Sequence, residues 1–313
     1  MSAAEIGQVL FTLLGLCVFE IVSSVDNAVV NADVLGTMSP KARRWFLLWG
    51  ILLAVFVVRG ALPWLIVWAV SPDLGPVDAF TATLTGDPAA RRMIEASAPI
   101  LLNGGGVFLL FLFCHWIFLQ KKELGLRPER FIQRQGVWFY AVVSVLLAII
   151  VWYGMHRDLH VGFAAVVGST AFFITHGFKE NAERVEQGLA GGASQLSDLS
   201  KILYLEVLDA SFSIDGVVGA FAFTSSVPLI LLGNGLGAVV LRTLTVRHIE
   251  TIRRYRLLKS GAMYSIGVLG AVMVLEAMGR HVPAWFPPLS TLLIIGYFAW
   301  CSVRLSKALT ADP

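Results

Sequence analysis

Nine long apolar runs constrain this chain more than any other feature of its sequence. They cover about residues 7–34, 45–70, 99–119, 137–155, 160–178, 202–225, 227–246, 260–279 and 288–306. A helix needs about 20 apolar residues to cross a bilayer core about 30 Å thick. It also satisfies its backbone hydrogen bonds internally, as lipid requires. The runs therefore predict an all-α, polytopic membrane helix bundle with about nine spans.

Composition excludes the main alternatives. Hydrophobic residues make up 57% of the chain and charged residues 14%, against about 45–50% and about 25% in a soluble domain. These values exclude a disordered chain, a disulfide scaffold and an ordinary cytosolic enzyme. Residues 71–98 and 179–200 are polar and are expected to be loops. We therefore treat residues 1–313 as a single integral membrane domain.

The distribution of basic residues predicts the orientation. Eighteen Lys and Arg fall in alternate connections and after the last span, whereas four fall on the other side. Cytoplasmic loops carry the excess of Lys and Arg. We therefore expect the N-terminus outside and the C-terminus in the cytoplasm.

Two short motifs in the chain resemble each other. In the first apolar run, Glu20 is followed six residues later by Asp26, within the letters EIVSSVDNAVV. In the sixth run, Asp209 is followed six residues later by Asp215, within DASFSIDGVVG. Both motifs contain the pattern Ser-(Val/Ile)-Asp-(Asn/Gly).

The apolar run after each motif carries one arginine at the same distance from a glycine. Arg59 follows Gly50 by nine residues, and Arg242 follows Gly233 by nine. Five spans separate the two units, an odd number, so the units run in opposite directions. We therefore predict an inverted-topology repeat, which places a substrate site near the midplane where the halves meet. The first repeat is spans 1–3 (residues 7–119), and the second is spans 6–8 (202–279). Connecting helices (137–178) lie between the two repeats, and a last span (288–306) follows the second.

Ionisable residues inside the predicted spans are the candidates for chemistry. Each costs about 2.5–3.5 kcal/mol at the bilayer centre even on the lenient insertion scale, so such groups pair or line cavities. Helical periodicity places the acids and hydroxyls of each motif on one arc of its helix. If the arcs face each other, they form one polar cavity. Its predicted ligands are Glu20, Asp26, Asn27, Asp209 and Asp215, assisted or gated by Ser23, Ser24, Arg59, Glu206, Ser213 and Arg242.

Oxygen donors of this kind suit hard divalent cations such as Mn²⁺, Ca²⁺ and Mg²⁺. The motifs contain no His or Cys, which disfavours zinc and copper, and we expect His176 to be solvated at the end of its span. The arginines are expected to pair with carboxylates when the cavity is empty. Two plainer interpretations stay open: Asp–Arg pairs that only join the halves, and serines that bond back to their own helices.

The motifs resemble a known family. The stretch 20–32 is similar to the E…S-x-D-N signature of the TerC family of integral membrane proteins, in the LysE transporter superfamily. Residues 205–222 and 236–246 resemble the second half of the family's domain-of-unknown-function branch. The resemblance implies efflux of divalent metal, manganese above all, with the five predicted ligands as the matching residues. This chain departs from the branch at 258–264 (LKSGAMY), where a stretch bearing Glu and His is usual.

We therefore expect a secondary transporter of the inner or plasma membrane, not an enzyme, that exports a divalent cation. Its partners are the lipid bilayer, the cation and protons as coupling ion, with no cofactor and no nucleic acid. Three alternatives remain: an exporter of a small organic solute such as an amino acid, a membrane scaffold with basic loops, and an intramembrane aspartyl protease using Asp26 and Asp215. The Gly-x-Gly-Asp and Tyr-Asp contexts expected of such a protease are missing.

Overall fold

The computed structural model describes residues 2–24, 38–50, 59–70, 75–85, 88–120, 127–190, 198–199, 201–202, 205, 216–254 and 257–311. Within these ranges the regular structure is helical, with no strand. The all-α prediction is therefore confirmed for the part of the chain that the structure describes.

The helices differ widely in length. They are α1 (Ala3–Ser23), α3 (Pro40–Trp45), α4 (Arg59–Val70), α5 (Pro76–Thr85), α6 (Pro88–Leu119), α7 (Arg127–Gln133), α8 (Phe139–Arg157), α9 (Leu159–Ala190), α11 (Val227–Arg254), α12 (Leu258–Ala277) and α13 (Phe286–Ala311). A π-helical turn, Phe46–Gly50, follows α3, and a 3-10 turn, Gly136–Trp138, precedes α8.

Among the described residues, six helices are long and apolar enough to cross a membrane. Their apolar segments are Ala4–Ser23, Ala96–Leu119, Gly136–Arg157, Leu159–Gly177, Leu258–Ala277 and Phe286–Arg304. These are the predicted first, third, fourth, fifth, eighth and ninth spans, and a shorter apolar stretch, Val227–Leu241, falls on the seventh. The structure describes the second and sixth only in part, so the count of nine stays a prediction.

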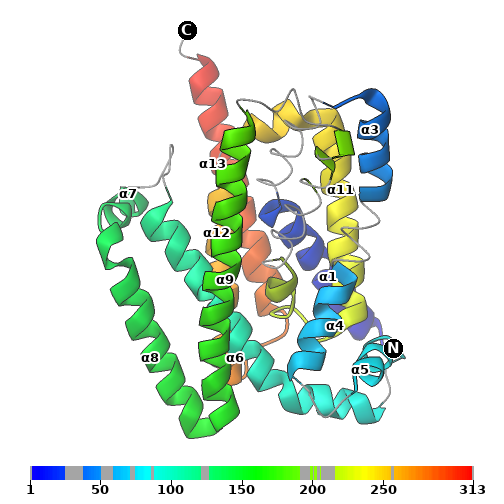
Figure 1. Cartoon of the computed structure of the whole chain (residues 1–313), viewed down its shortest axis with the longest axis vertical. Coiled ribbons are helices and arrows are strands. Elements are labelled where there is room, and N and C mark those ends of the chain that lie inside the picture. Colours follow the sequence, from blue (N-terminus) through cyan, green and yellow to red (C-terminus); the bar gives the residue numbers. More distant parts are fainter. Residues whose placement is uncertain are drawn as a thin grey trace.

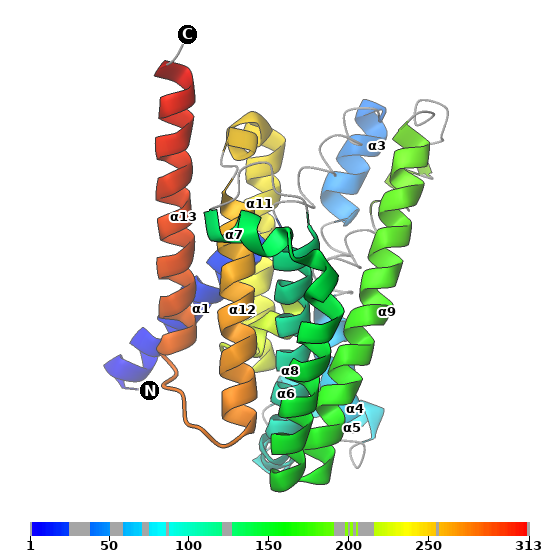
Figure 2. The same cartoon turned by 90° about the vertical axis from the view of Figure 1, so that its left-hand side faces the viewer.

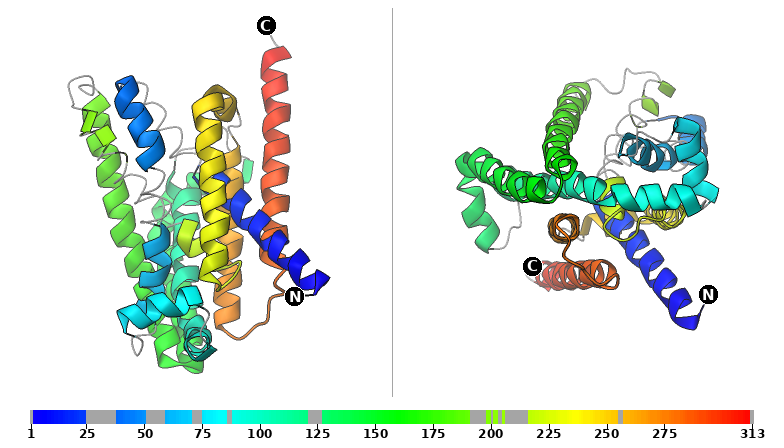
Figure 3. Two further views of the ribbon diagram at one scale, coloured as in Figure 1. Left: turned by 90° about the vertical axis from the view of Figure 1, so that its right-hand side faces the viewer. Right: turned by 90° about the horizontal axis from the view of Figure 1, so that it is seen from below.

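Helix α6 lies at the centre of the bundle. Its most extensive interfaces are with α12 and α9, and α8 packs against α9. On the other side α1 packs on α11, while α13 packs on α12 and α1. Figures 1 and 2 show α8, α9, α11, α12 and α13 running roughly along one common axis. Helix α1 crosses them obliquely, and its N-terminal half projects from the bundle (Figure 3).

Glycines let α6 approach both of its main neighbours. A Cβ atom on Gly106 would lie 2.9 Å from the Gly270 carbonyl oxygen of α12. One on Gly104 would lie 3.0 Å from the Ala164 carbonyl oxygen of α9. Small residues at such crossings let membrane helices pack backbone against backbone.

The described parts of two expected loops are largely helical. Residues 71–98 contain α5 and the first part of α6, which begins at Pro88. Proline is well accepted in the first turn of a helix because the missing N–H has no intrahelical partner there. Residues 179–200 carry α9 on to Ala190. A membrane helix needs apolar side chains only where it meets lipid. The polar end of α9 therefore carries no apolar run from which a helix could be predicted.

Basic residues gather toward one end of the bundle. Helix α3 carries Lys41, Arg43 and Arg44, and α7 carries Arg127 and Arg130. Both helices lie toward the end at which α13 finishes, whereas α5 and the α8–α9 turn lie at the other (Figures 1 and 2). The side of the membrane that each end faces stays a prediction. So does the inverted repeat, because its motif residues 25–37 and 206–215 lie outside the described residues.

Candidate functional site

Glu20 is a buried carboxylate near the end of α1. Its side chain is 1% exposed, and its Oε1 accepts a hydrogen bond of 2.8 Å from the Ser24 hydroxyl. The Ser23 hydroxyl instead donates to the Glu20 carbonyl oxygen at 3.3 Å. The two serines therefore differ: Ser24 orients the carboxylate, and Ser23 bonds back to its own helix.

Two glycines from the second half of the chain leave room for this carboxylate. A Cβ on Gly216 would lie 2.9 Å from Glu20 Oε2. One on Gly237 of α11 would lie 2.7 Å from both the Cys17 carbonyl oxygen and Glu20 Cβ. Glu20 thus lies where α1, α11 and the short helical stretch 216–220 meet. Gly216 belongs to the second motif, so the structure brings the end of that motif against the first.

Asn234 is a polar residue near this place that the sequence analysis missed. It lies three residues before Gly237 on α11, and its side chain is 1% exposed. Neither its Oδ1 nor its Nδ2 has a hydrogen-bond partner among the described residues. An unsatisfied buried polar group costs about 1–3 kcal/mol, so Asn234 is a candidate for contact with a polar ligand. The signal was an amide inside the apolar run VPLILLGNGLGAVVL.

Two predicted arginines lie on described helices. Arg59 begins α4 and Arg242 lies within α11. Across the described ranges, no group of three or more His, Cys, Asp or Glu could hold a metal ion. The remaining predicted residues, Asp26, Asn27, Glu206, Asp209, Ser213 and Asp215, lie outside the described residues.

A histidine pair lies between α6 and α9. The rings of His115 and His176 have centroids 3.9 Å apart, and His176 stacks on Phe172 with centroids 5.5 Å apart. Both histidines are partly exposed, so the solvation of His176 at the end of its span stays a prediction. The ring of His115 covers it from a helix distant in sequence. The missed signal was His115 itself, an ionisable residue within the apolar letters FLFCHWIF.

A second buried acid lies on α7. Glu129 is 0% exposed and forms a side-chain hydrogen bond with Tyr264 of α12. Tyr264 belongs to the stretch 258–264 that departs from the pattern of the resembled branch. The sequence places Glu129 in a basic connection between the third and fourth predicted spans. The structure instead folds this short helix against the bundle.

The fold and the exposed surface define the class of this protein. Large apolar side chains cover the outside of α8, with Val145, Trp152 and Tyr153 each more than 60% exposed. Such a surface suits lipid rather than water. The molecule is a polytopic helical membrane protein.

The chain belongs to the family DUF475, described as proteins of unknown function, whose model matches residues 25–309. It is also 28% identical over 82 residues to the uncharacterized membrane protein YceF of Bacillus subtilis (strain 168). That match covers 26% of this chain and 32% of YceF. No solved structure matches the chain.

Proposed function

We propose that this protein is a secondary transporter that exports a divalent metal cation, with Mn²⁺ favoured and Ca²⁺ or Mg²⁺ as alternatives. Protons are the proposed coupling ion. One observation carries the proposal: Glu20, a carboxylate within the apolar segment Ala4–Ser23, is 1% exposed and lies against the second motif at Gly216. Ionisable groups within membrane spans mark ion and proton pathways.

The donor chemistry supports a hard cation. Glu20 offers carboxylate oxygens, and Asn234, one turn from Gly237, offers a carbonyl oxygen with no described partner. Carboxylate and amide oxygens are the ligands that Mn²⁺, Ca²⁺ and Mg²⁺ prefer. Asp215, a predicted ligand, directly precedes Gly216 in the sequence. The proposed site therefore draws ligands from both motifs.

Coupling to protons follows from the same chemistry. An ionised carboxylate binds a cation far better than a protonated one, so proton uptake by the ligand carboxylates favours release of the metal. The Ser24 hydroxyl donates to Glu20 Oε1, which holds this carboxylate in one orientation. Export rather than uptake is what the TerC resemblance implies, since an inverted repeat is indifferent to direction.

The test is the metal content of cells, measured by elemental mass spectrometry in a host lacking its own manganese efflux. Cells carrying empty vector, the native protein, Glu20→Gln or Asp215→Asn are challenged with a panel of divalent salts. We expect the native protein to lower the content of one metal severalfold. Either substitution should return it to the empty-vector level, because the amide keeps the shape and removes the charge.

Glu5→Gln is the matched control. Glu5 is an exposed acid in the first turn of the same helix, where it forms a capping box with Ser2. Glutamine also serves at this capping position, so this variant should export as the native protein does. Equal metal content in all strains, at equal membrane expression, would refute metal export. Amino-acid efflux would then be measured in the same strains.

A further inference from the structure

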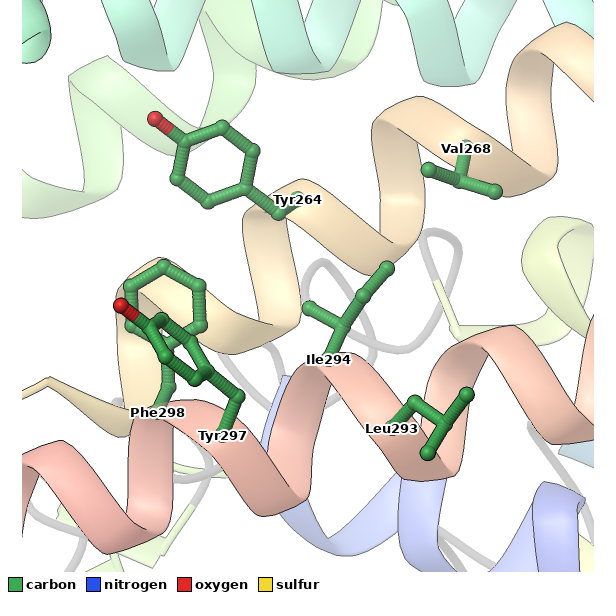
Figure 4. A pocket seen from close by; sticks show the side chains of 6 residues that line it. All are labelled: Tyr264, Val268, Leu293, Ile294, Tyr297 and Phe298. Atoms are coloured by element: carbon green, nitrogen blue, oxygen red, sulfur yellow. The ribbon is translucent and has the colours of Figure 1, made fainter.

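An apolar groove opens on the outer face of the bundle between α12 and α13. Its volume is about 360 Å³, and Figure 4 shows the side chains that line it. They are Tyr264 and Val268 from α12 and Leu293, Ile294, Tyr297 and Phe298 from α13. Leu293 is 65% exposed and Tyr297 54% exposed, so the groove faces the surroundings of the bundle. In a membrane those surroundings are lipid.

The groove has room for a hydrocarbon chain. A methylene group takes about as much space as a water molecule, about 30 Å³, so about a dozen methylene groups fit. The lining offers no charged group, only aliphatic and aromatic surface and two phenols. A chain of this length is most of one fatty acyl tail of a phospholipid.

A positively charged group stands beyond one end of the groove on the same helix. Leu293, Tyr297, Trp300 and Arg304 follow one another at helical spacing and so share a face of α13. Arg304 lies seven residues past Tyr297, a rise of about 10 Å along the helix. Its Cζ lies 3.8 Å from the centre of the Trp300 ring.

The cation–π contact leaves this guanidinium suited to bind phosphate. The indole face attracts the guanidinium, whose five N–H donors match the geometry of a phosphate. The groove and the arginine together match the tail and the phosphate of one lipid. A zwitterionic headgroup carries its own compensating cation, so the arginine favours a headgroup with net negative charge. Arg304 belongs to the C-terminal part of α13, and α13 ends toward the end of the bundle where the basic helices α3 and α7 lie (Figure 2).

We propose that the groove between α12 and α13 is a binding site for one anionic phospholipid of the surrounding bilayer, with an acyl chain against Leu293 and Ile294 and the phosphate at Arg304. The site is separate from Glu20 and stands whether or not the protein carries a metal.

Native mass spectrometry of the full chain in detergent tests the proposal, with dioleoyl phosphatidylglycerol and dioleoyl phosphatidylcholine added separately. The first bound phosphatidylglycerol should have a dissociation constant about fivefold lower than the first phosphatidylcholine. This factor follows because a basic side chain near an anionic surface contributes about 1 kcal/mol, and 1.4 kcal/mol is tenfold. Arg304→Gln should remove the preference, and Arg304→Lys, which keeps the charge, should retain it.

Two further variants locate the lipid. Leu293→Trp places a large side chain in the groove and should weaken binding of the first molecule of both lipids. Since Leu293 is exposed, this variant should fold. Arg280→Gln removes an exposed positive charge at the other end of the bundle and should leave binding as in the native protein. The proposal is overturned if Arg304→Gln keeps the preference, or if Leu293→Trp binds its first lipid as the native protein does.

Discussion

Replacing Gly168 with alanine should push α6 and α9 apart. A Cβ atom on residue 168 would overlap the carbonyl oxygen of Gly104. It would also lie 2.8 Å from the carbonyl carbon of Gly104 and 3.0 Å from the Cα of Gly104. Carbon atoms pack best about 3.5–4.0 Å apart, so the helices must separate by about 1 Å. These are backbone atoms, which no rotamer change can move aside.

The cost of that separation can be estimated. Overpacking costs about 1–3 kcal/mol, and a gap of about 1 Å loses up to about half of each neighbouring contact. The interface also holds a hydrogen bond of 2.7 Å from Asn103 Nδ2 to the Val161 carbonyl oxygen, which the separation would strain. Alanine regains about 1 kcal/mol of helix propensity. We expect Gly168→Ala to lower the free energy of unfolding by about 2 kcal/mol.

Gly177→Ala supplies the comparison on the same helix. A Cβ on Gly177 meets no atom within 4 Å, so this variant should be up to about 1 kcal/mol more stable than the native protein. Unfolding by sodium dodecyl sulfate in mixed micelles, followed by far-ultraviolet circular dichroism, measures both. If Gly168→Ala unfolds at the same detergent fraction as Gly177→Ala, the close approach of α6 and α9 at this point is refuted.

Two further predictions concern the ends of the helices. Gly279 has a φ of +82°, which strains an L side chain, so Gly279→Ala should cost about 1–2 kcal/mol in the same unfolding assay. The Arg157 guanidinium, which a Cβ there would overlap, ends a flexible side chain and can move aside. Gly296→Ala, inside α13, meets no atom within 4 Å and should be up to about 1 kcal/mol more stable, as Gly177→Ala is. Hydrogen bonds from the Ser39 hydroxyl and N–H lower the pKa of Asp198. The stability that this contact contributes is therefore fully present above the ordinary pKa of aspartate, and it is lost as pH falls through the lowered pKa. In a carboxyl NMR titration Ser39→Ala should move the pKa of Asp198 up toward its ordinary value, and an unchanged titration would contradict the contact.

The candidate site shows how far local patterns reach. Ser24 lies four residues after Glu20, and helical periodicity alone placed both on one side of α1, where the hydrogen bond forms. The contact of Glu20 with Gly216 was expected only from the similarity of two motifs distant in sequence. Asn234 belongs to neither motif. A single amide within an apolar run was therefore not predicted to be part of a site.

The class and much of the helix plan were determined by the sequence alone. A helix that crosses lipid needs a long run of consecutive apolar residues, so six spans could be predicted from the sequence. Helical segments outside the predicted spans, such as α5 and the end of α9, were not predicted because they contain polar residues and no long apolar run. The pairs His115 with His176 and Glu129 with Tyr264 were decided by tertiary structure. Each joins separate helices, and which faces of two helices meet depends on how the whole bundle packs.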